Sequence, residues 1–382
     1  MTDEATVVAD RLARTQAALR SNGTATLLAG VGADLRYLTG YTAHGLERLT
    51  MLVLPANGPA TLVVPRLEAM AAAASPAGVA DLVEIVAWDE TDDPYALVAA
   101  RVSVADAASA ARLLVDPGLP ARHLLSLERM LPGRAFGLAT DVTRQLRIVK
   151  DGGEIGLLRR AAHAADRVVA QIAAGRLIGR TEADVSREVR ERLVAEGHQA
   201  ASFAIVGSGP NSASPHHDPA DRVIGPGDPI VLDIGGTLSG YGSDITRMLW
   251  VTGGDAARGP SPEFLAIFDL VHRANEAATA AVRPDVGCAA LDEVAREIIR
   301  AGGHGEAFIH RLGHGIGLDA HEEPYLVAGS ADVLEPGHAF SIEPGIYLAG
   351  RFGVRLEDIV VCTADRPDVL NRAPRDLMVV DG

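Results

Sequence analysis

Cysteine is almost absent from this chain, which has only Cys288 and Cys362. Two cysteines cannot build a disulfide scaffold or a four-cysteine zinc site, so the sequence excludes both classes. We expect both thiols to be reduced, as thiols are in cytoplasmic proteins. Any metal site must therefore be built from histidine, aspartate and glutamate side chains.

Long apolar runs and excess positive charge are also missing. No run reaches the roughly 18 residues that span a bilayer, and the N-terminal stretch "MTDEATVVADRLARTQAAL" has no apolar signal core. The formal net charge is −15, and an acidic chain is repelled by phosphate backbones and anionic lipid. We therefore expect a cytoplasmic protein that binds neither nucleic acid nor membranes.

Aromatic residues are few, at 4% of the chain, whereas hydrophobic residues make up 48%. Ala, Val and Leu must then carry most of the burial, which is readily achieved in an α/β protein. A length of 382 residues suggests two domains. The stretch "KDGGE" breaks the pattern at residues 150–154, so we predict one domain over residues 1–145 and a second over 150–382.

The two predicted domains differ in their element pattern. Before residue 145, short apolar runs such as "TATLLAGV" alternate with helical stretches, which predicts an α/β domain with an open, mostly parallel or mixed sheet. Beyond residue 200, β-like runs bounded by Gly and Pro are interrupted by two helices, predicted at 261–283 and 287–301. This order is typical of an α+β domain with an antiparallel sheet.

Four acidic residues lie in apolar, strand-like runs of the second domain. Asp233 lies in "IVLDIGG" and Asp244 in "YGSDITRMLW", joined by a turn-rich connector that predicts a hairpin. Glu343 lies in "FSIEPGIY" and Glu357 in "GVRLEDIVV". An unpaired buried charge costs several kcal/mol, roughly, so a positive group should lie beside each acid.

Two interpretations of these acids remain open. Arg247 and Arg355 could neutralise some of them as structural ion pairs. The four acids together with a glycine-flanked histidine exceed the nearby basic residues, however, and divalent cations would resolve the deficit. Oxygen donors with one imidazole suit Mn²⁺, Co²⁺ or Zn²⁺. Four carboxylates and one histidine are enough for two ions about 3.5–4 Å apart.

A histidine-rich stretch, "HRLGHGIGLDAHEEP" at residues 310–324, contains His310, His314 and His321. It could be a metal or catalytic site, or a polar surface loop. His310 and His314 have the spacing of HExxH zinc proteases, but Arg311 stands where the catalytic glutamate would be. No GxSxG serine-hydrolase elbow is present.

Five stretches, "VLDIGG", "SDITR", "GHGIGL", "SIEPGIY" and "VRLED", resemble in order and context those of the pita-bread (M24) metallopeptidases. The resemblance spans roughly residues 145–380, and the preceding segment looks like the smaller domain of the prolidase and aminopeptidase P branch. It implies an α/β creatinase/prolidase-type N-terminal domain followed by an α+β pita-bread catalytic domain.

The resemblance also implies a dinuclear metal centre. Its ligands would be Asp233, Asp244, His314, Glu343 and Glu357. Asp244 and Glu357 would bridge two ions, most suitably Mn²⁺, with Co²⁺ or Zn²⁺ as alternatives. Glu343 would also act as the proton shuttle for a hydroxide that bridges the metals, and Tyr241 would orient Asp244.

Further residues are assigned roles by the same resemblance. His321 would donate to the carbonyl or the leaving nitrogen of the scissile bond, and His310 would line the pocket for proline. His216, in "SGPNSASPHHDPA", would hydrogen bond to substrate, with the adjacent His217 as the alternative. Arg355 would orient the carboxylates that hold the metals.

The expected activity is hydrolysis of Xaa-Pro dipeptides by a prolidase. Proline forms a tertiary amide with a rigid ring, so a dedicated pocket is chemically reasonable. The alternatives are an Xaa-Pro aminopeptidase (aminopeptidase P) acting on longer peptides, a metal-free hydrolase like creatinase, and a binding module without catalysis. The last two would be favoured by missing ligands, and here all five are present.

A dipeptidase also needs a cation for the free carboxylate of its substrate, and an arginine fork matches a carboxylate well. The N-terminal stretch "GADLRYLTGYTAHGLERLT" offers Arg48, Arg36 and His44. We hypothesise that Arg48 reaches the active site of a neighbouring subunit in a homodimer or dimer of dimers, with Asp34 near the substrate amine. A plain surface arginine is the alternative.

Overall fold

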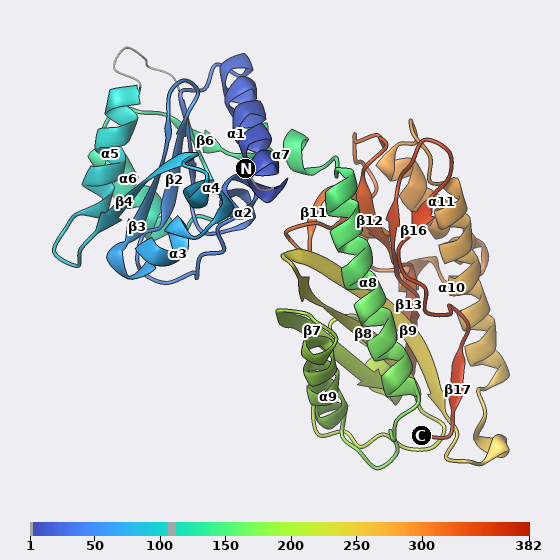
Figure 1. Ribbon diagram of the computed structural model, residues 1–382. Coiled ribbons are helices and arrows are strands. Elements are labelled where there is room, and N and C mark those ends of the chain that lie inside the picture. Colours follow the sequence, from blue (N-terminus) through green and yellow to red (C-terminus); the bar gives the residue numbers. More distant parts are fainter. Residues whose placement is uncertain (1–2, 106–111) are drawn as a thin grey trace. The chain divides into compact units, whose positions relative to one another are not determined.

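The computed structural model describes residues 3–105 and 112–382, and its internal contacts divide the chain into two compact units. The first unit is Met1–Arg147 and the second is Ile148–Gly382. Both units contain helices and strands, but their sheets are built differently, so each unit is described by itself (Figure 1).

The first unit contains a six-stranded mixed sheet with the spatial order β4-β3-β2-β1-β5-β6. Its strands are β1 (Thr26–Ala29), β2 (Met51–Pro55), β3 (Ala60–Pro65), β4 (Val83–Trp88), β5 (Leu113–Val115) and β6 (Phe136–Leu138). Strand β1 is antiparallel to β2 and parallel to β5. Every residue of β1, β2, β3 and β5 is buried, because helices and loops cover both faces. The predicted α/β domain with a mixed sheet is confirmed.

In the described part of this unit, seven α-helices connect and cover the strands (Figure 1). They are α1 (Asp3–Ser21), α2 (Ala33–Thr39), α3 (Ala69–Ala73), α4 (Pro76–Val79), α5 (Pro94–Ala105), α6 (Ala121–Met130) and α7 (Thr140–Arg147), with a short 3₁₀ helix η1 (Arg66–Glu68). Leu28, Val53 and Leu127 belong to the apolar cluster that joins the sheet to α5 and α6.

The second unit is built from three antiparallel-rich sheets. A four-stranded sheet has the order β17-β9-β8-β7, a five-stranded sheet has the order β11-β10-β12-β15-β16, and β13 pairs with β14. The first sheet contains β7 (Ala200–Ser208), β8 (Pro229–Leu238), β9 (Tyr241–Val251) and β17 (Met378–Val380). The others contain β10 (Gly313–Gly315), β11 (Glu322–Leu326), β12 (Ala339–Ile342), β13 (Gly345–Leu348), β14 (Phe352–Arg355), β15 (Asp358–Val361) and β16 (Asp368–Val369).

Four α-helices of this unit flank the sheets (Figure 1). They are α8 (Gly152–Ala173), α9 (Glu182–Ala195), α10 (Pro262–Ala281) and α11 (Cys288–Ala301), with the 3₁₀ helices η2 (Gly209–Ala213), η3 (Ala256–Arg258) and η4 (Gly305–Ala307). Asp151 and Glu154 form a capping box that starts α8, and the Thr181 side chain caps α9. Among the residues that the structure describes, no helix is long and apolar enough to cross a bilayer.

The two faces of the hairpin of β8 and β9 pack against different helices. Leu232 and Ile245 lie in the apolar cluster with α8 and α9, whereas Val231 and Met248 lie in the cluster with α10 and α11. Because side chains alternate along a strand, Asp233 points to the same side as Val231. The functional side chains of this hairpin therefore face the space between the sheets.

The predicted hairpin between Asp233 and Asp244 is confirmed. Its two-residue turn has positive φ angles, 51° at Ser239 and 88° at Gly240, as in the type I′ turns that suit twisted hairpins. The resulting register places Asp233 opposite Thr246 and Asp244 opposite Gly235. Both carboxylates consequently emerge on one face of the ladder.

Candidate metal centre

One cavity of about 730 Å³ in the second unit collects the side chains of interest. Strands β8, β9 and β10 contribute Asp233, Asp244 and His314. Glu343 lies in the link between β12 and β13, and Glu357 lies in the link between β14 and β15. The lining also includes His216, His310, His321 and Arg355. The structure thus brings together nine of the eleven residues that the sequence nominated for the site.

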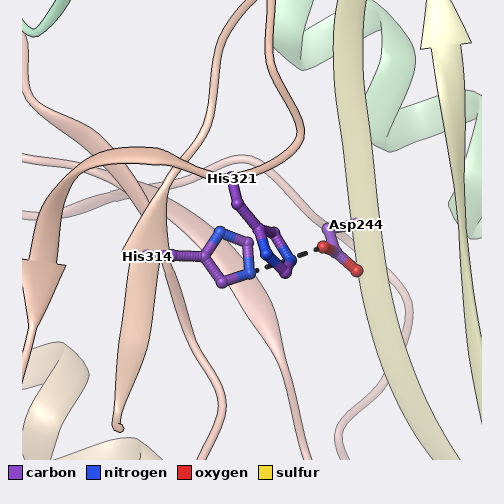
Figure 2. A group of neighbouring side chains, drawn as sticks. All are labelled: Asp244, His314 and His321. Carbon is purple, nitrogen blue, oxygen red and sulfur yellow. Dashed lines mark ion pairs between the residues drawn. The ribbon is translucent and has the colours of Figure 1, made fainter. Parts of the chain in front are cut away.

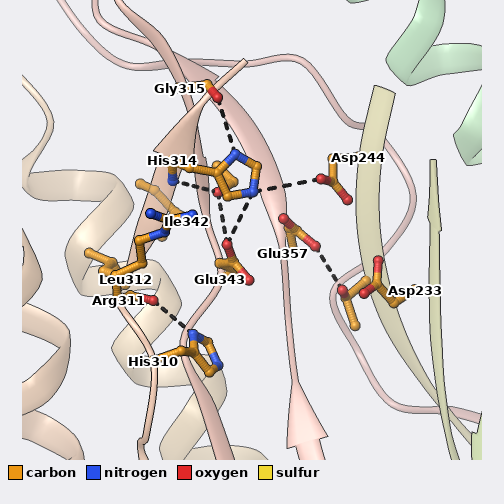
Figure 3. Close-up of polar contacts among 12 residues, drawn as sticks. Asp233, Asp244, His310, Arg311, Leu312, His314, Gly315, Ile342, Glu343 and Glu357 are labelled. Carbon is orange, nitrogen blue, oxygen red and sulfur yellow. Dashed lines mark hydrogen bonds and ion pairs between the residues drawn. The ribbon is translucent and has the colours of Figure 1, made fainter. Parts of the chain in front are cut away.

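Donor atoms of the five nominated metal ligands lie close enough to share cations (Figure 3). Nε2 of His314 is 3.4 Å from Oε1 of Glu343 and 3.8 Å from Oδ2 of Asp244. Three overlapping groups have donors within 4.8 Å of one another: Asp233, Asp244 and Glu357; His314, Glu343 and Glu357; and Asp244, His314 and His321. Because these groups share members, they form one continuous set of oxygen and nitrogen donors.

His321 belongs to this set as well as facing the cavity. Its ring centroid lies 3.8 Å from that of His314, and both imidazoles point toward Asp244 (Figure 2). The sequence assigned His321 to the substrate alone. The geometry adds that its imidazole lies within reach of a cation held by Asp244 and His314.

The carboxylate of Asp233 has one oxygen that accepts no hydrogen bond from the described residues. Oδ2 of Asp233 accepts a hydrogen bond from Arg355, but its Oδ1 is buried and has no hydrogen-bond partner among the described residues. A buried unsatisfied carboxylate oxygen is costly. A divalent cation would remove that cost, so the donor set fits metal ions of the kind that prefer oxygen and imidazole.

Burial raises the pKa of all four carboxyl groups, and neighbouring carboxylates add to the effect at Asp244, Glu343 and Glu357. Desolvation is the largest cause, and it raises the pKa of Glu343 to about 7. The pKa values of Asp244 and Glu357 lie well above the usual range, because each is desolvated and also faces other carboxylates. The pKa of Asp233 is raised by desolvation, against which the Arg355 charge acts. Without cations this site is therefore short of positive charge.

Burial has the opposite effect on the histidines. Desolvation, together with the neighbouring His321, lowers the pKa of His314 to about 3. Desolvation and the Arg355 charge lower the pKa of His310 to about 4. Both imidazoles are therefore neutral at physiological pH, which is the form that binds metals or accepts hydrogen bonds.

Arg355 connects several residues of the site. It donates to Asp233, to Oγ1 of Thr246 at 3.1 Å and to the Tyr347 hydroxyl at 2.8 Å. Thr246 in turn donates to Oε2 of Glu357 at 2.8 Å. Thr246 and Tyr347 were not nominated from the sequence, although both lie inside stretches that carried the resemblance, "SDITR" and "SIEPGIY".

Arg247, considered as a neutralising partner for the acids, has a different position. Its guanidinium is fully buried, lies 2.6 Å from Oδ1 of Asp358 and donates to the backbone carbonyl of Glu357. It therefore supports the backbone at Glu357 and leaves the carboxylates that line the cavity to Arg355 and Arg311.

The two adjacent histidines after "SASP" point to different places. His216 lines the cavity, whereas Nε2 of His217 lies 2.7 Å from the fully buried Glu182 carboxylate. Tyr241, which the sequence placed beside Asp244, donates its hydroxyl to Glu154 at 2.8 Å. Of the two histidines, His216 is therefore the one that faces the cavity.

The glycines beside His314 have a structural cause. An added Cβ at Gly313 would lie 1.9 Å from the carbonyl oxygen of Ser341, and one at Gly315 would lie 2.3 Å from that of Glu323. These glycines therefore let the neighbouring strands β11 and β12 approach β10.

Arg48 and Asp34, the remaining nominated residues, lie in the first unit. Arg48 is paired with Glu90 at 2.7 Å and with Glu47 at 2.8 Å near the surface. The buried Asp34 accepts hydrogen bonds from Thr143 and Arg147 at 2.9 and 2.8 Å. Their roles toward a substrate stay predictions.

Comparison with known proteins identifies the family. Residues 156–364 match Metallopeptidase family M24, and residues 11–149 match the Creatinase/Prolidase N-terminal domain. The chain belongs to metallopeptidase family M24, with a creatinase-type N-terminal domain and a pita-bread catalytic domain. It is a metal-dependent peptidase, and its family implies divalent metal ions and peptide substrates.

Individual relatives resemble the whole chain. A probable dipeptidase PepE of Mycobacterium tuberculosis is 47% identical and covers 99% of this chain and 98% of its own length. The crystal structure of dipeptidase PepE from Mycobacterium ulcerans is also 47% identical, with a TM-score of 0.90 and 99% of each chain covered. A prolidase from Thermococcus sibiricus is 35% identical, with a TM-score of 0.89, covering 97% of this chain and 98% of that one.

The raised carboxyl pKa values predict how stability changes with pH. Asp244 and Glu357 stay protonated in the metal-free fold at pH values where the unfolded chain has released those protons. The unfolded state then binds fewer protons, so stability falls as pH rises, by up to about 1.4 kcal/mol per pH unit for each such group. Between pH 7 and 8 ordinary histidines are already mostly neutral.

We therefore expect the melting temperature of metal-free protein to fall from pH 7 to pH 8, and the stabilisation by added Mn²⁺ to grow over the same window. Differential scanning calorimetry in chelator and in Mn²⁺ measures both. The variant Asp244→Asn should flatten the metal-free profile. An equally steep profile in that variant would contradict this explanation.

Proposed function

We propose that this protein is an Xaa-Pro dipeptidase, a prolidase, that works with two divalent cations per chain. The observation that carries this proposal is the buried donor set in one cavity, with an oxygen of Asp233 left without a partner among the described residues. The dipeptidase and prolidase relatives support it.

Five side chains would hold the cations. The set is Asp233, Asp244, His314, Glu343 and Glu357. One imidazole among carboxylates favours Mn²⁺, with Co²⁺ or Zn²⁺ as alternatives. When bound, such ions polarise the scissile carbonyl. They also lower the pKa of a water molecule that they hold to about 7.

The chain's own residues carry the proton transfers. Glu343, which accepts a hydrogen bond from Ser341 at 3.1 Å, takes a proton from the attacking water and returns it to the leaving nitrogen. His321 and His216 face the same cavity and donate hydrogen bonds to substrate oxygens. Arg355 holds Asp233 in orientation through the direct hydrogen bond between them.

The pocket for proline is formed around His310. Its ring lies edge-on to Phe308, with centroids 5.1 Å apart, and its Nε2 lies 2.9 Å from the Tyr347 hydroxyl. Burial keeps this imidazole neutral by lowering its pKa to about 4. A neutral ring flanked by aromatic side chains offers a mostly apolar wall, which suits the ring of proline better than a cation would.

An enzyme that selects dipeptides must recognise the free carboxylate at the C-terminal end of its substrate. Arg48, with a side chain that is 30% exposed, would supply a fork for that carboxylate in the active site of a neighbouring subunit, and Asp34 would lie near the substrate amine. This arrangement requires a homodimer or a dimer of dimers. Without such a clamp, an Xaa-Pro aminopeptidase acting on longer peptides is the alternative.

A substrate panel tests the activity. Metal-stripped protein should be inactive, and added Mn²⁺ should restore turnover of Ala-Pro, Met-Pro and Leu-Pro, measured by release of free proline. Non-prolyl dipeptides of the same size serve as controls and should be cleaved at least about tenfold more slowly, because one pocket contact is worth about that factor. Full activity in excess chelator, or faster cleavage of Ala-Ala, would contradict the proposal.

Substitution Arg48→Ala tests the carboxylate clamp. We expect kcat/KM for Leu-Pro to fall about 10- to 100-fold, since a charged hydrogen-bond pair is lost, with little change for Leu-Pro-Gly. Arg36→Ala, in the same stretch, is the control variant. Equal losses on the dipeptide and the tripeptide would count against a carboxylate clamp, and no loss on either would leave Arg48 a surface residue.

A further inference from the structure

Asn275 lies in the middle of α10 and is fully buried. Its amide nitrogen donates one hydrogen bond to the backbone carbonyl of Ile342 at 3.0 Å and another to that of Leu356 at 3.2 Å. Its oxygen, Oδ1, is buried and has no hydrogen-bond partner among the described residues. Among the described residues, this side chain therefore forms its hydrogen bonds only with these two carbonyls.

The two carbonyls lie where the chain passes between the five-stranded sheet and the pair of β13 and β14. One segment links β12 to β13, and the other links β14 to β15. The ladder between β12 and β15 ends at the pair Ile342 and Asp358, and the ladder between β13 and β14 begins at the pair Gly345 and Arg355. Between these pairs one long backbone hydrogen bond joins the segments, from the Leu356 N–H to the Pro344 carbonyl at 3.4 Å. The Asn275 amide supplies two further donors at this gap, one to each segment.

Each carbonyl belongs to the residue immediately before a candidate metal ligand. Because a peptide unit is planar, fixing the Ile342 and Leu356 carbonyls also fixes the directions in which Glu343 and Glu357 continue. The opposite sides of those peptide units are held as well. Glu343 donates its N–H to Leu312 at 2.8 Å, and Glu357 donates its N–H to Thr246 at 3.2 Å.

We propose that Asn275 is a positioning residue that sets the separation of Glu343 and Glu357, so that both carboxylates can hold the cations. Among the contacts described above, the Asn275 amide is the side-chain group that bonds to both segments at once. The inference deepens the proposed function and rests on it, because it concerns the same pair of divalent ions.

The variant Asn275→Leu tests this role, since leucine has a similar volume and no donors. Metal-stripped protein is titrated with Mn²⁺ by isothermal titration calorimetry, and kcat and KM for Leu-Pro are measured in saturating Mn²⁺. We expect at least a tenfold rise in the dissociation constant of one ion, the range found for outer partners of metal ligands. We also expect a fall in kcat with KM within about twofold.

Thr279→Val provides the matched control. Thr279 lies one turn further along α10, is buried, and its hydroxyl has no hydrogen-bond partner among the described residues. This variant should bind Mn²⁺ as the wild type does. If Asn275→Leu does not fold, Asn275→Ala removes the same donors and leaves space for water.

A purely structural Asn275 gives a different result. In that case the melting temperature of the metal-free variant falls while its two Mn²⁺ dissociation constants match the wild type, which would overturn the positioning role. Failure of the proposed function is recognised separately, because wild-type protein itself would then bind fewer than two Mn²⁺ per chain.

Discussion

The repulsion among four desolvated carboxylates is the constraint around which the catalytic unit is built. Burial raises the pKa of Asp244 and of Glu357, and repulsion from Asp233 and Glu343 raises both further. Such a cluster opposes folding, so the surrounding structure must supply the driving force. Two apolar clusters do so, one between the hairpin and α8 with α9, the other reaching α10 and α11. The acids lie between these clusters, on the face shared with Val231.

Irregular backbone delivers most of the functional side chains. Glu343 and Glu357 lie where strands leave one ladder for another, and His314 lies where the register of β10 and β11 shifts. A regular strand would send alternate side chains to opposite faces. Each irregular backbone segment needs its own hydrogen-bond partners, which is why Asn275, Arg247 and Thr246 are buried beside the site.

The sequence predicted what local pattern determines. The hairpin of Asp233 and Asp244 followed from a turn between two apolar runs, and the acids stood out because their neighbours are apolar. The sequence did not predict contacts set by distant segments. Nothing near Asn275 in the chain indicates that two strand links, far along the sequence, will present carbonyls to it. The sequence also did not predict that the Ser341 carbonyl lies close to Gly313, because the two residues are far apart along the chain.

Protons and cations compete for this centre. The metal-free site lowers its charge by keeping carboxyl groups protonated, whereas burial already holds His314 neutral by lowering its pKa to about 3. A cation entering the site must therefore displace protons from Asp244 and Glu357, but none from His314. Arg355 keeps Asp233 partly compensated throughout, which favours Asp233 as the ionised acid in the metal-free protein.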